Sequence, residues 1–195
     1  MFAFGNKHPY HEVVISTQIK SSSPVAIAVH EQRPYVVNAS KLSTFCGSMR
    51  SGVGIPYDIT TKSGKPLAED MLEIILTAFS KAGVKAIPVT TRSGLSKQAF
   101  VDELKKAEAA RSIYISILEW KTDTYMNASL HCLLHLEIFD NTGKTIAESS
   151  VKASGENFGG SFWNPKKAAK KGSLKAMKLK LEALLNVPAV INAFD

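Results

Sequence analysis

The stretch Ala128-Ser-Leu-His-Cys-Leu-Leu-His-Leu-Glu-Ile-Phe139 decides the fold class, because apolar and polar side chains alternate along most of its length. The apolar set recurs at every second residue, which is the period of a β-strand: Leu130, Cys132, Leu134, Leu136 and Ile138. The polar set falls on the opposite face: Ser129, His131, His135 and Glu137. One apolar face and one polar face are typical of a half-buried antiparallel strand.

Two more strands are predicted on either side of this one. Residues 112–121 and 144–153 have β-rich composition, and Asp140-Asn-Thr-Gly143 has the residues of a hairpin turn. A second hairpin is expected around residues 122–127. Together these segments predict a three-strand meander in the second half of the chain.

Three helices are predicted from apolar residues at helical spacing. The first covers residues 67–82 and ends at Gly83, a helix stop signal. The second begins after Ser96, a good N-cap, and the third covers residues 166–185 and ends before Pro188. Further strands are expected at residues 12–20, 25–29, 35–37 and 84–91. The order predicts an α/β (α+β) fold, with a mixed, largely antiparallel sheet and helices packed mainly on one face.

The length of 195 residues predicts a single domain over residues 1–195. Residues 1–11 and 189–195 are expected to be peripheral tails. Residues 38–65 are rich in Gly, Ser and Thr and predict one long irregular loop. Such a loop either has a function or covers an edge of the sheet.

The composition favours anionic partners without choosing among them. The net charge is +7, and 45% of the residues are hydrophobic. A basic surplus attracts nucleic acid, anionic lipid or acidic polymers, but it also serves solubility alone. We expect no transmembrane segment, because no apolar stretch is long enough to span a bilayer. Cys46 and Cys132 lie in no motif, and whether they pair is left open.

Motifs for chemistry are missing from the sequence. His131 and His135 would lie roughly 13 Å apart on one strand face, too far for one metal ion. Ser63-Gly-Lys-Pro66 resembles the end of a P-loop, but Ile59 replaces the required glycine and Pro66 the required Ser or Thr. No nucleophile elbow is present. We therefore predict no catalytic residue, no metal site and no cofactor.

Two surfaces are candidates for binding. Four lysines fall on one side of the last helix at a spacing of three to four: Lys167, Lys171, Lys175 and Lys178. This face either docks on an anionic surface or is simply solvated. Residues 155–165 form an aromatic, glycine-rich loop that contains Phe158, Phe162 and Trp163. These rings either anchor a partner or fill the end of the core.

The segment Pro24-Val-Ala-Ile-Ala-Val-His-Glu-Gln-Arg33, a strand that ends in an acidic-x-Arg turn, resembles the YajG-like family of bacterial lipoproteins. The helix at 67–83 followed by a strand at Val84, and the end of the chain, fit the same family. The resemblance implies a mixed α/β envelope domain with no known enzymatic activity, tethered by a lipidated cysteine. From these residues we expect a departure from the family pattern, since neither a leader nor such a cysteine is recognised among them.

The leading hypothesis is a non-catalytic periplasmic accessory protein that binds another envelope protein, an anionic polymer or a lipid surface. If a lipidated leader was removed, the protein would be anchored at the outer membrane; otherwise it would be cytoplasmic. The expected contact surface combines Arg33, Arg50, the 47–57 loop with Tyr57, and the aromatic loop. One alternative is a basic nucleic-acid-binding domain. The other is a hydrolase or transferase with an active site that has no motif.

Overall fold

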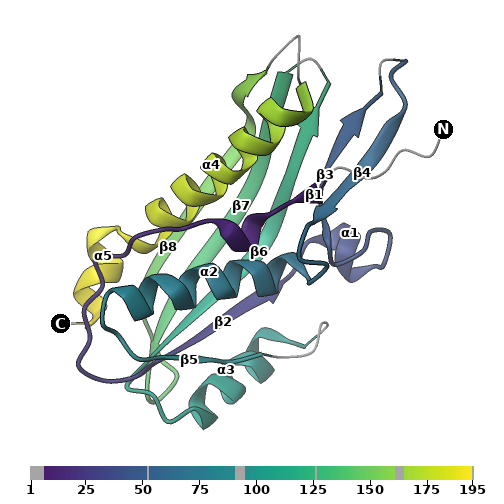
Figure 1. Ribbon diagram of the computed structural model, residues 1–195. Helices are drawn as coiled ribbons and strands as arrows, with labels where there is room; N and C mark the ends of the chain where they lie inside the picture. The colour runs from purple at the N-terminus through teal and green to yellow at the C-terminus, as the bar shows by residue number, and fades with distance from the viewer. Residues whose placement is uncertain (1–6, 52, 91–94, 126, 161–164, 195) are drawn as a thin grey trace.

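The computed structural model describes residues 7–51, 53–90, 95–125, 127–160 and 165–194. Its centre is a mixed eight-stranded sheet (Figure 1). The strands run in the order β1, β4, β3, β6, β2, β5, and β7 and β8 extend the sheet from the other edge of β6. Their bounds are β1 Lys7–His8, β2 Val25–Glu31, β3 Phe45–Arg50, β4 Pro56–Thr61, β5 Ala86–Pro88, β6 Arg111–Thr124, β7 Asn127–Asp140 and β8 Thr145–Gly160.

The three-strand meander predicted from the alternating pattern is present, with longer strands than expected. β6 pairs with β7 and β7 pairs with β8, both antiparallel. The predicted turn after β7 is closed by the Asp140 carboxylate, which accepts hydrogen bonds from the amides of Thr142 (2.8 Å) and Lys144 (3.1 Å). The hydrogen bonds from Thr142 lower the pKa of Asp140. Alternation along a strand thus predicted these elements well, because their partners are neighbours in sequence.

Two strands, β2 and β3, pair with successive parts of the same edge of β6. We call the place where they separate the fork of the sheet. β2 runs parallel to the first half of β6, from Arg111 to Ile117. β3 runs parallel to the second half, from Thr122 to Thr124. β3 and β6 lie so close at Gly47 that a Cβ on this residue would be 2.1 Å from the Thr122 hydroxyl. Only glycine allows this approach.

Helices cover both faces of the sheet unequally. α2 (Leu67–Lys81) and α4 (Pro165–Leu185) pack on one face over the larger apolar cluster (Figure 1). α3 (Lys97–Lys106) covers part of the other face over a smaller cluster that includes Phe100 and Tyr114. The Ser96 hydroxyl caps α3 by accepting a hydrogen bond from the Ala99 amide at 3.2 Å, as predicted. The α+β class, with helices mainly on one face, is confirmed.

The segment at residues 13–20 is extended but belongs to no strand ladder, so the strand predicted at 12–20 is wrong. It follows a short helix, η1 (Tyr10–Glu12), and crosses the helical layer between α2 and α4 (Figure 1). Side chains of α4 and the residue after it hold it: Glu182 accepts from the Ser16 amide at 2.9 Å, and Asn186 accepts from the Gln18 amide at 2.8 Å. We call residues 13–20 the strap. Its side chains alternate between buried and exposed, as those of a strand would. The strap nevertheless packs on helices and pairs with none of the described strands.

Residues 34–65 also differ from their prediction. The strand expected at 35–37 is a short helix, α1 (Pro34–Val37), which Pro34 favours because its fixed φ suits a first helical turn. The irregular loop expected at 38–65 contains the antiparallel β3–β4 hairpin. Glycine at positions 47, 52 and 54 interrupts the apolar alternation that identifies a strand.

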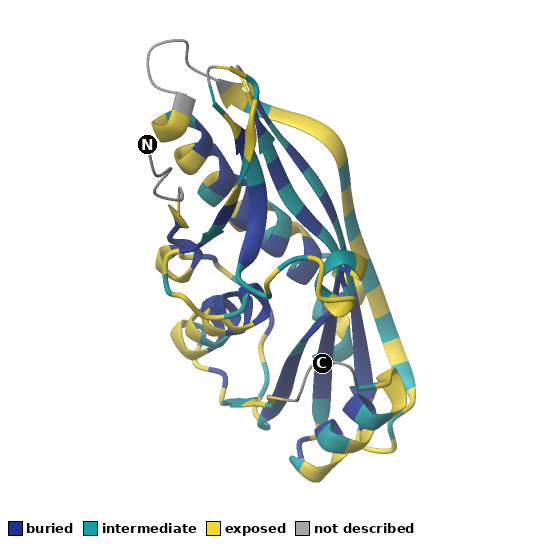
Figure 2. Cartoon of the chain, turned by 90° about the vertical axis from the view of Figure 1, so that its right-hand side faces the viewer, coloured by how far each residue is buried: buried dark blue, intermediate teal, exposed yellow. Residues whose placement is uncertain are grey.

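The ends of the described chain are more firmly packed than tails. His8 and Tyr10 are fully buried near the N-terminus, and so is Val190 in α5 (Pro188–Ile191), which η2 (Asn192–Phe194) follows. The loop expected at 155–165 is strand up to Gly160, the end of β8. Figure 2 shows that buried residues concentrate between helices and sheet, whereas β8 alternates between half-buried and exposed from Thr145 to Ser154 and is exposed over residues 154–157. No helix in the described part of the chain is long and apolar enough to cross a membrane.

Candidate functional site

A buried ion pair closes the fork of the sheet. The Arg33 guanidinium donates to both carboxylate oxygens of Glu31, at 2.8 Å from Nε and 2.5 Å from Nη2. It also donates to two backbone carbonyls, those of Phe45 (2.7 Å) and Trp120 (3.0 Å). These carbonyls belong to β3 and β6, so one side chain at the end of β2 joins the three strands. We call the Glu31–Arg33 pair with these acceptors the latch.

The latch explains the acidic-x-Arg turn and changes the role expected for Arg33. The Arg33 side chain is completely buried, so it holds strands together and does not lie on a contact surface. Burial lowers the pKa of Arg33, but the hydrogen bonds and charge of Glu31 outweigh it and leave the pKa raised. A charged pair in the interior is retained only where hydrogen bonds satisfy both partners, and both are satisfied here.

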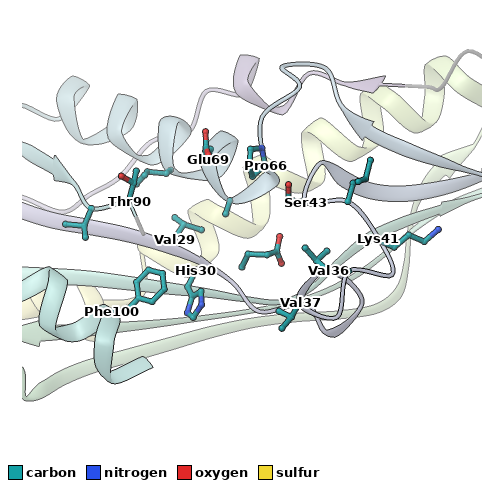
Figure 3. Close-up of a pocket in the computed structure, with 16 residues that line it drawn as sticks. Val29, His30, Val36, Val37, Lys41, Ser43, Pro66, Glu69, Thr90 and Phe100 are labelled. Atoms are coloured by element: carbon teal, nitrogen blue, oxygen red, sulfur yellow. The ribbon is translucent and has the colours of Figure 1, made fainter. Parts of the chain in front are cut away.

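Next to the latch lies a pocket of about 570 Å³ at the carboxyl end of β2 (Figure 3). Its walls come from β2, from α1 and the chain that follows it, from the start of α2, from the chain after β5, and from α3. Most of the lining is apolar: Val29, Val36, Leu42, Ala68, Leu72 and Phe100. A mainly apolar concave site with a small set of polar groups is the usual form of a binding site.

Three of the polar side chains that line the pocket, those of His30, Glu31 and Lys41, have partners within the chain. His30 Nδ1 lies 2.6 Å from the Tyr114 hydroxyl, and the His30 ring stacks on Phe100 with centroids 3.9 Å apart. Burial lowers the pKa of His30 to about 4, so the ring is neutral at neutral pH. Lys41 donates to both oxygens of Asp58 at 2.6 and 2.9 Å. Glu31 is held in the latch, so all three side chains contribute to packing within the chain.

The pocket also borders a strand edge that stops short. The β2–β5 ladder ends where Ile27 faces Pro88, and the Ile27 carbonyl accepts from the Val89 amide at 2.8 Å. β2 itself continues for four more residues to Glu31. In a parallel ladder, alternate residues turn their amide and carbonyl toward the same neighbour. Val29 and Glu31 therefore turn backbone groups toward the pocket side, where β5 no longer extends.

A second buried polar cluster lies under β1 and η1. His8 Nδ1 is 2.9 Å from the Ser173 hydroxyl of α4, and the Trp120 indole donates to the Tyr10 hydroxyl at 3.2 Å. Burial lowers the pKa of His8 to about 4 and raises the pKa of Tyr10. Among the described residues, no group of three or more His, Cys, Asp or Glu is placed to hold a metal ion.

The two cysteines are buried and free. Cys46 Sγ donates to the Ile59 carbonyl at 3.4 Å, which places it inside the β3–β4 hairpin. Burial raises the pKa of both thiols, and for Cys132 the pKa is raised to about 11. A protonated, enclosed thiol is a poor nucleophile and a poor metal ligand, so neither cysteine has the setting of a reactive one.

The remaining residues of the predicted contact surface are dispersed. Arg50 lies at the end of β3, half-exposed, 3.7 Å from Asp123. Tyr57 packs partly against the core, and burial raises its pKa. Phe158 lies on β8 against α4, where a Cβ on Gly172 would be 2.1 Å from its ring, so this aromatic fills the core. Phe162 and Trp163 lie outside the described residues.

The lysines of α4 form the exposed outer face of the helix, opposite its apolar stripe. Lys167, Lys171, Lys175 and Lys178 are all exposed. Lys178 lies 3.9 Å from Glu182, and Lys180 pairs with Glu156 at 2.5 Å. The predicted basic face is thus present.

Sequence reasoning missed the pocket. Its lining comes from segments predicted as a strand at 35–37 and an irregular loop at 38–65, and from the first turn of α2. One signal was available: Glu31, Arg33 and Pro34 follow a buried strand directly, which marks the end of β2 as a place where the chain changes direction.

No protein-family model matches the sequence. No curated protein matches it either. Among solved structures, protein XCC0632 from Xanthomonas campestris, of family DUF330, superimposes with a TM-score of 0.50 at 10% identity, over 92% of this chain and 89% of that one. The chain has the fold of XCC0632. That likeness extends to architecture alone, because one fold serves many functions.

Two further solved structures resemble the chain less. Lipoprotein GNA1162 from Neisseria meningitidis has a TM-score of 0.39 at 10% identity, over 80% of this chain and 97% of that one. PelC from Paraburkholderia phytofirmans, a dodecamer, has a TM-score of 0.43 at 10% identity, over 89% of this chain and 94% of that one.

Proposed function

We propose that the protein is a non-catalytic accessory protein of the bacterial cell envelope, and that it binds another envelope protein through the pocket at the end of β2. The observation that carries the proposal is the make-up of this pocket. Its walls are mainly apolar, and the His30, Glu31 and Lys41 side chains in it are committed to partners within the chain.

Binding fits this pocket better than catalysis does. A general acid or base needs a side chain that can exchange a proton with a bound substrate. The His30 imidazole bonds to Tyr114 and stays neutral at neutral pH, and both oxygens of Glu31 accept from Arg33. A hydrolase or transferase that used His30 or Glu31 would have to break one of these arrangements before it acted.

The envelope assignment rests on the resemblance to YajG-like lipoproteins. The turn that carries the resemblance, Glu31-x-Arg33, is the latch, so the residues that match are ones on which this sheet depends. We place the protein in the periplasm, where a lipidated leader would anchor it to the outer membrane.

The proposed partner contributes an extended segment. Val29 and Glu31 turn backbone groups toward the side of β2 that β5 leaves open, and an extended peptide can add to such an edge. Apolar side chains of that peptide would enter the pocket between Leu72 on one wall and Phe100 on the other. Main-chain hydrogen bonds would give affinity, and the pocket would give specificity.

The envelope location can be tested by fractionation. The full-length gene product, expressed from its own gene with all upstream codons, is expected in the periplasmic or outer-membrane fraction. Soluble marker proteins of the cytoplasm and the periplasm provide the controls. Recovery of the protein with the cytoplasmic marker would overturn the envelope part of the proposal.

The pocket can be tested by crosslinking in the cell. A benzoylphenylalanine at Val37, an exposed residue of the pocket rim, is expected to give one discrete adduct with an envelope protein. Ala68→Phe, which places a ring inside the pocket, should reduce that adduct on the order of tenfold. Ala183→Phe on the exposed face of α4 is the matched control and should leave it unchanged. An adduct that survives Ala68→Phe would show that the partner binds elsewhere.

A further inference from the structure

Two turns lie side by side at the end of the sheet where β3 and β6 finish. β3 and β6 are parallel, and Met49 faces Thr124 in their register. The turn between β3 and β4 therefore leaves the sheet next to the turn between β6 and β7, and both project from the same end in Figure 1. The first turn is closed by hydrogen bonds from the Gly54 amide to the Ser51 carbonyl (2.8 Å) and from the Ser51 amide to the Ile55 carbonyl (2.9 Å).

These turns carry large apolar side chains that no other part of the described chain covers. Val53 is 82% exposed and Ile55 is 65% exposed, both in the turn after β3. Tyr125, directly after β6, is 49% exposed. Single exposed apolar residues are common on soluble proteins, but three on two adjacent projecting turns form a cluster that indicates a partner.

Basic side chains lie at the same end of the molecule as this apolar cluster. Asn127 faces Gly160 in the β7–β8 register, so β8 finishes at the same end, and α4 starts there shortly afterwards (Figure 1). The first two turns of α4 carry four exposed lysines: Lys166, Lys167, Lys170 and Lys171. Arg50 lies at the end of β3 beside the turns, where Asp123, 3.7 Å away, offsets its charge.

We propose that this end of the molecule docks on an anionic lipid surface, with Val53, Ile55 and Tyr125 entering the bilayer interface and the lysines of α4 meeting the lipid phosphates. Apolar side chains on projecting turns can enter an interface without any change in the fold. The lysines at this end are attracted electrostatically to an anionic leaflet, and a Tyr ring suits the boundary between acyl chains and water. The surface is separate from the β2 pocket, so it stands whether or not the pocket binds a protein.

The chemistry of the cluster favours lipid over other partners. A stable protein interface needs roughly 800 Å² on each partner, and three projecting side chains provide only a small part of that area. Nucleic acid would contact the lysines, but it would gain nothing from the aliphatic side chains of Val53 and Ile55, because strands are bound through phosphates and stacked bases. Aliphatic side chains that can insert between lipids, together with lysines that attract phosphates, fit an anionic membrane surface.

Co-sedimentation of the full chain with vesicles tests the proposal. We expect binding to phosphatidylcholine vesicles that contain phosphatidylglycerol, and much weaker binding to phosphatidylcholine alone. Val53→Ser with Ile55→Ser should weaken binding on the order of tenfold, since the apolar insertion is lost. Lys166→Gln with Lys170→Gln should weaken it by a similar factor and flatten its dependence on salt.

Matched controls come from the opposite end of the sheet. Ile146→Ser and Lys144→Gln alter an exposed aliphatic residue and an exposed lysine at the β7–β8 turn, and both should bind vesicles like the unmodified chain. Equal binding to neutral and anionic vesicles, or full binding by the Val53→Ser, Ile55→Ser variant, would overturn the proposal. A basic face that serves nucleic acid would also overturn it: an oligonucleotide would then bind the chain, and only the lysine variants would weaken that binding.

Discussion

Glu31 and Asp70 are both buried carboxylates, and the chain treats them in opposite ways. Glu31, at the end of β2, accepts three hydrogen bonds from Arg33, one of them from its backbone amide at 3.1 Å. Asp70, in the first turn of α2, is completely buried, and neither of its carboxylate oxygens has a partner at full hydrogen-bond geometry among the described residues, although the Ser63 hydroxyl is near enough to lower its pKa. Burial raises the pKa of Asp70 above its usual 3.8, with Ser63 and His11 opposing the rise.

The difference shows which buried charge the fold depends on. Glu31 and Arg33 connect strands β2, β3 and β6 at the fork, where no regular ladder joins β2 to β3. Among the described residues, Asp70 makes no hydrogen bond that connects one element to another. The positive end of the α2 dipole nevertheless favours a carboxylate in the first turn. We infer that the first charge maintains the architecture and that the second reduces stability at neutral pH.

Breaking the latch should have the largest effect. Arg33→Met removes the donor and leaves the Glu31 charge buried without a partner. We expect a loss of about 3–5 kcal/mol in the free energy of unfolding, the usual cost of such a break. Urea unfolding followed by circular dichroism measures it. Because Glu31 then has no cation, Glu31→Leu with Arg33→Met should be less destabilising than Arg33→Met alone. A double variant as unstable as the single one would show that the carbonyl contacts, and not the ion pair, hold the fork.

Acid should destabilise the protein through its two buried imidazoles. His8 and His30 have pKa values lowered by burial from 6.5 to about 4, so the folded protein keeps them neutral where the unfolded chain binds protons. Stability is therefore fully present above pH 6.5 and is lost as the pH falls toward about 4. A pKa that differs by one between the folded and unfolded states is worth roughly 1.4 kcal/mol, so a few kcal/mol are at stake.

The matching measurement is the urea midpoint as a function of pH. His30→Gln should reduce the acid-induced loss of stability, since one of the two buried imidazoles is gone. The comparison is made as a slope against pH, so any loss of packing against Phe100 cancels. An unchanged slope in His30→Gln would contradict the assignment.

Removing the buried charge of Asp70 should have the smallest effect, and it should raise the free energy of unfolding instead of lowering it. Because the folded pKa of Asp70 is raised, this group costs stability as the pH rises from 3.8 through that pKa. Asp70→Asn should leave stability near about pH 4 almost unchanged and raise it near about pH 7, by about 1 kcal/mol or less. Glu69→Gln, on the exposed face of the same turn, is the control and should not show this pH-dependent gain.

The sequence allowed the meander, the three main helices and the class of the fold to be predicted, because these follow from local periodicity. The alternation at residues 128–139 and the cap at Ser96 both act over short sequence distances. The β3–β4 hairpin was missed because glycines break its pattern. The strap was misassigned because its alternation is real and only its partners, the side chains of Glu182 and Asn186, are distant.

The site was harder to predict than the fold. Arg33 was expected on a contact surface because of the family resemblance, but it is buried and donates to the carbonyls of Phe45 and Trp120. A backbone carbonyl carries no sequence signal. The pocket likewise arises where five separate segments meet, and no residue type marks such a meeting point.

The strap also determines when folding can finish. Its Ser16 and Gln18 amides bond to Glu182 and Asn186, residues that lie almost a whole chain length away. During synthesis the amino-terminal segment must therefore wait until the last helix has left the ribosome. Until then the apolar side chains of the strap, Val13, Ile15 and Ile19, are not yet fully covered, and exposed apolar surface in an incomplete chain is what chaperones bind.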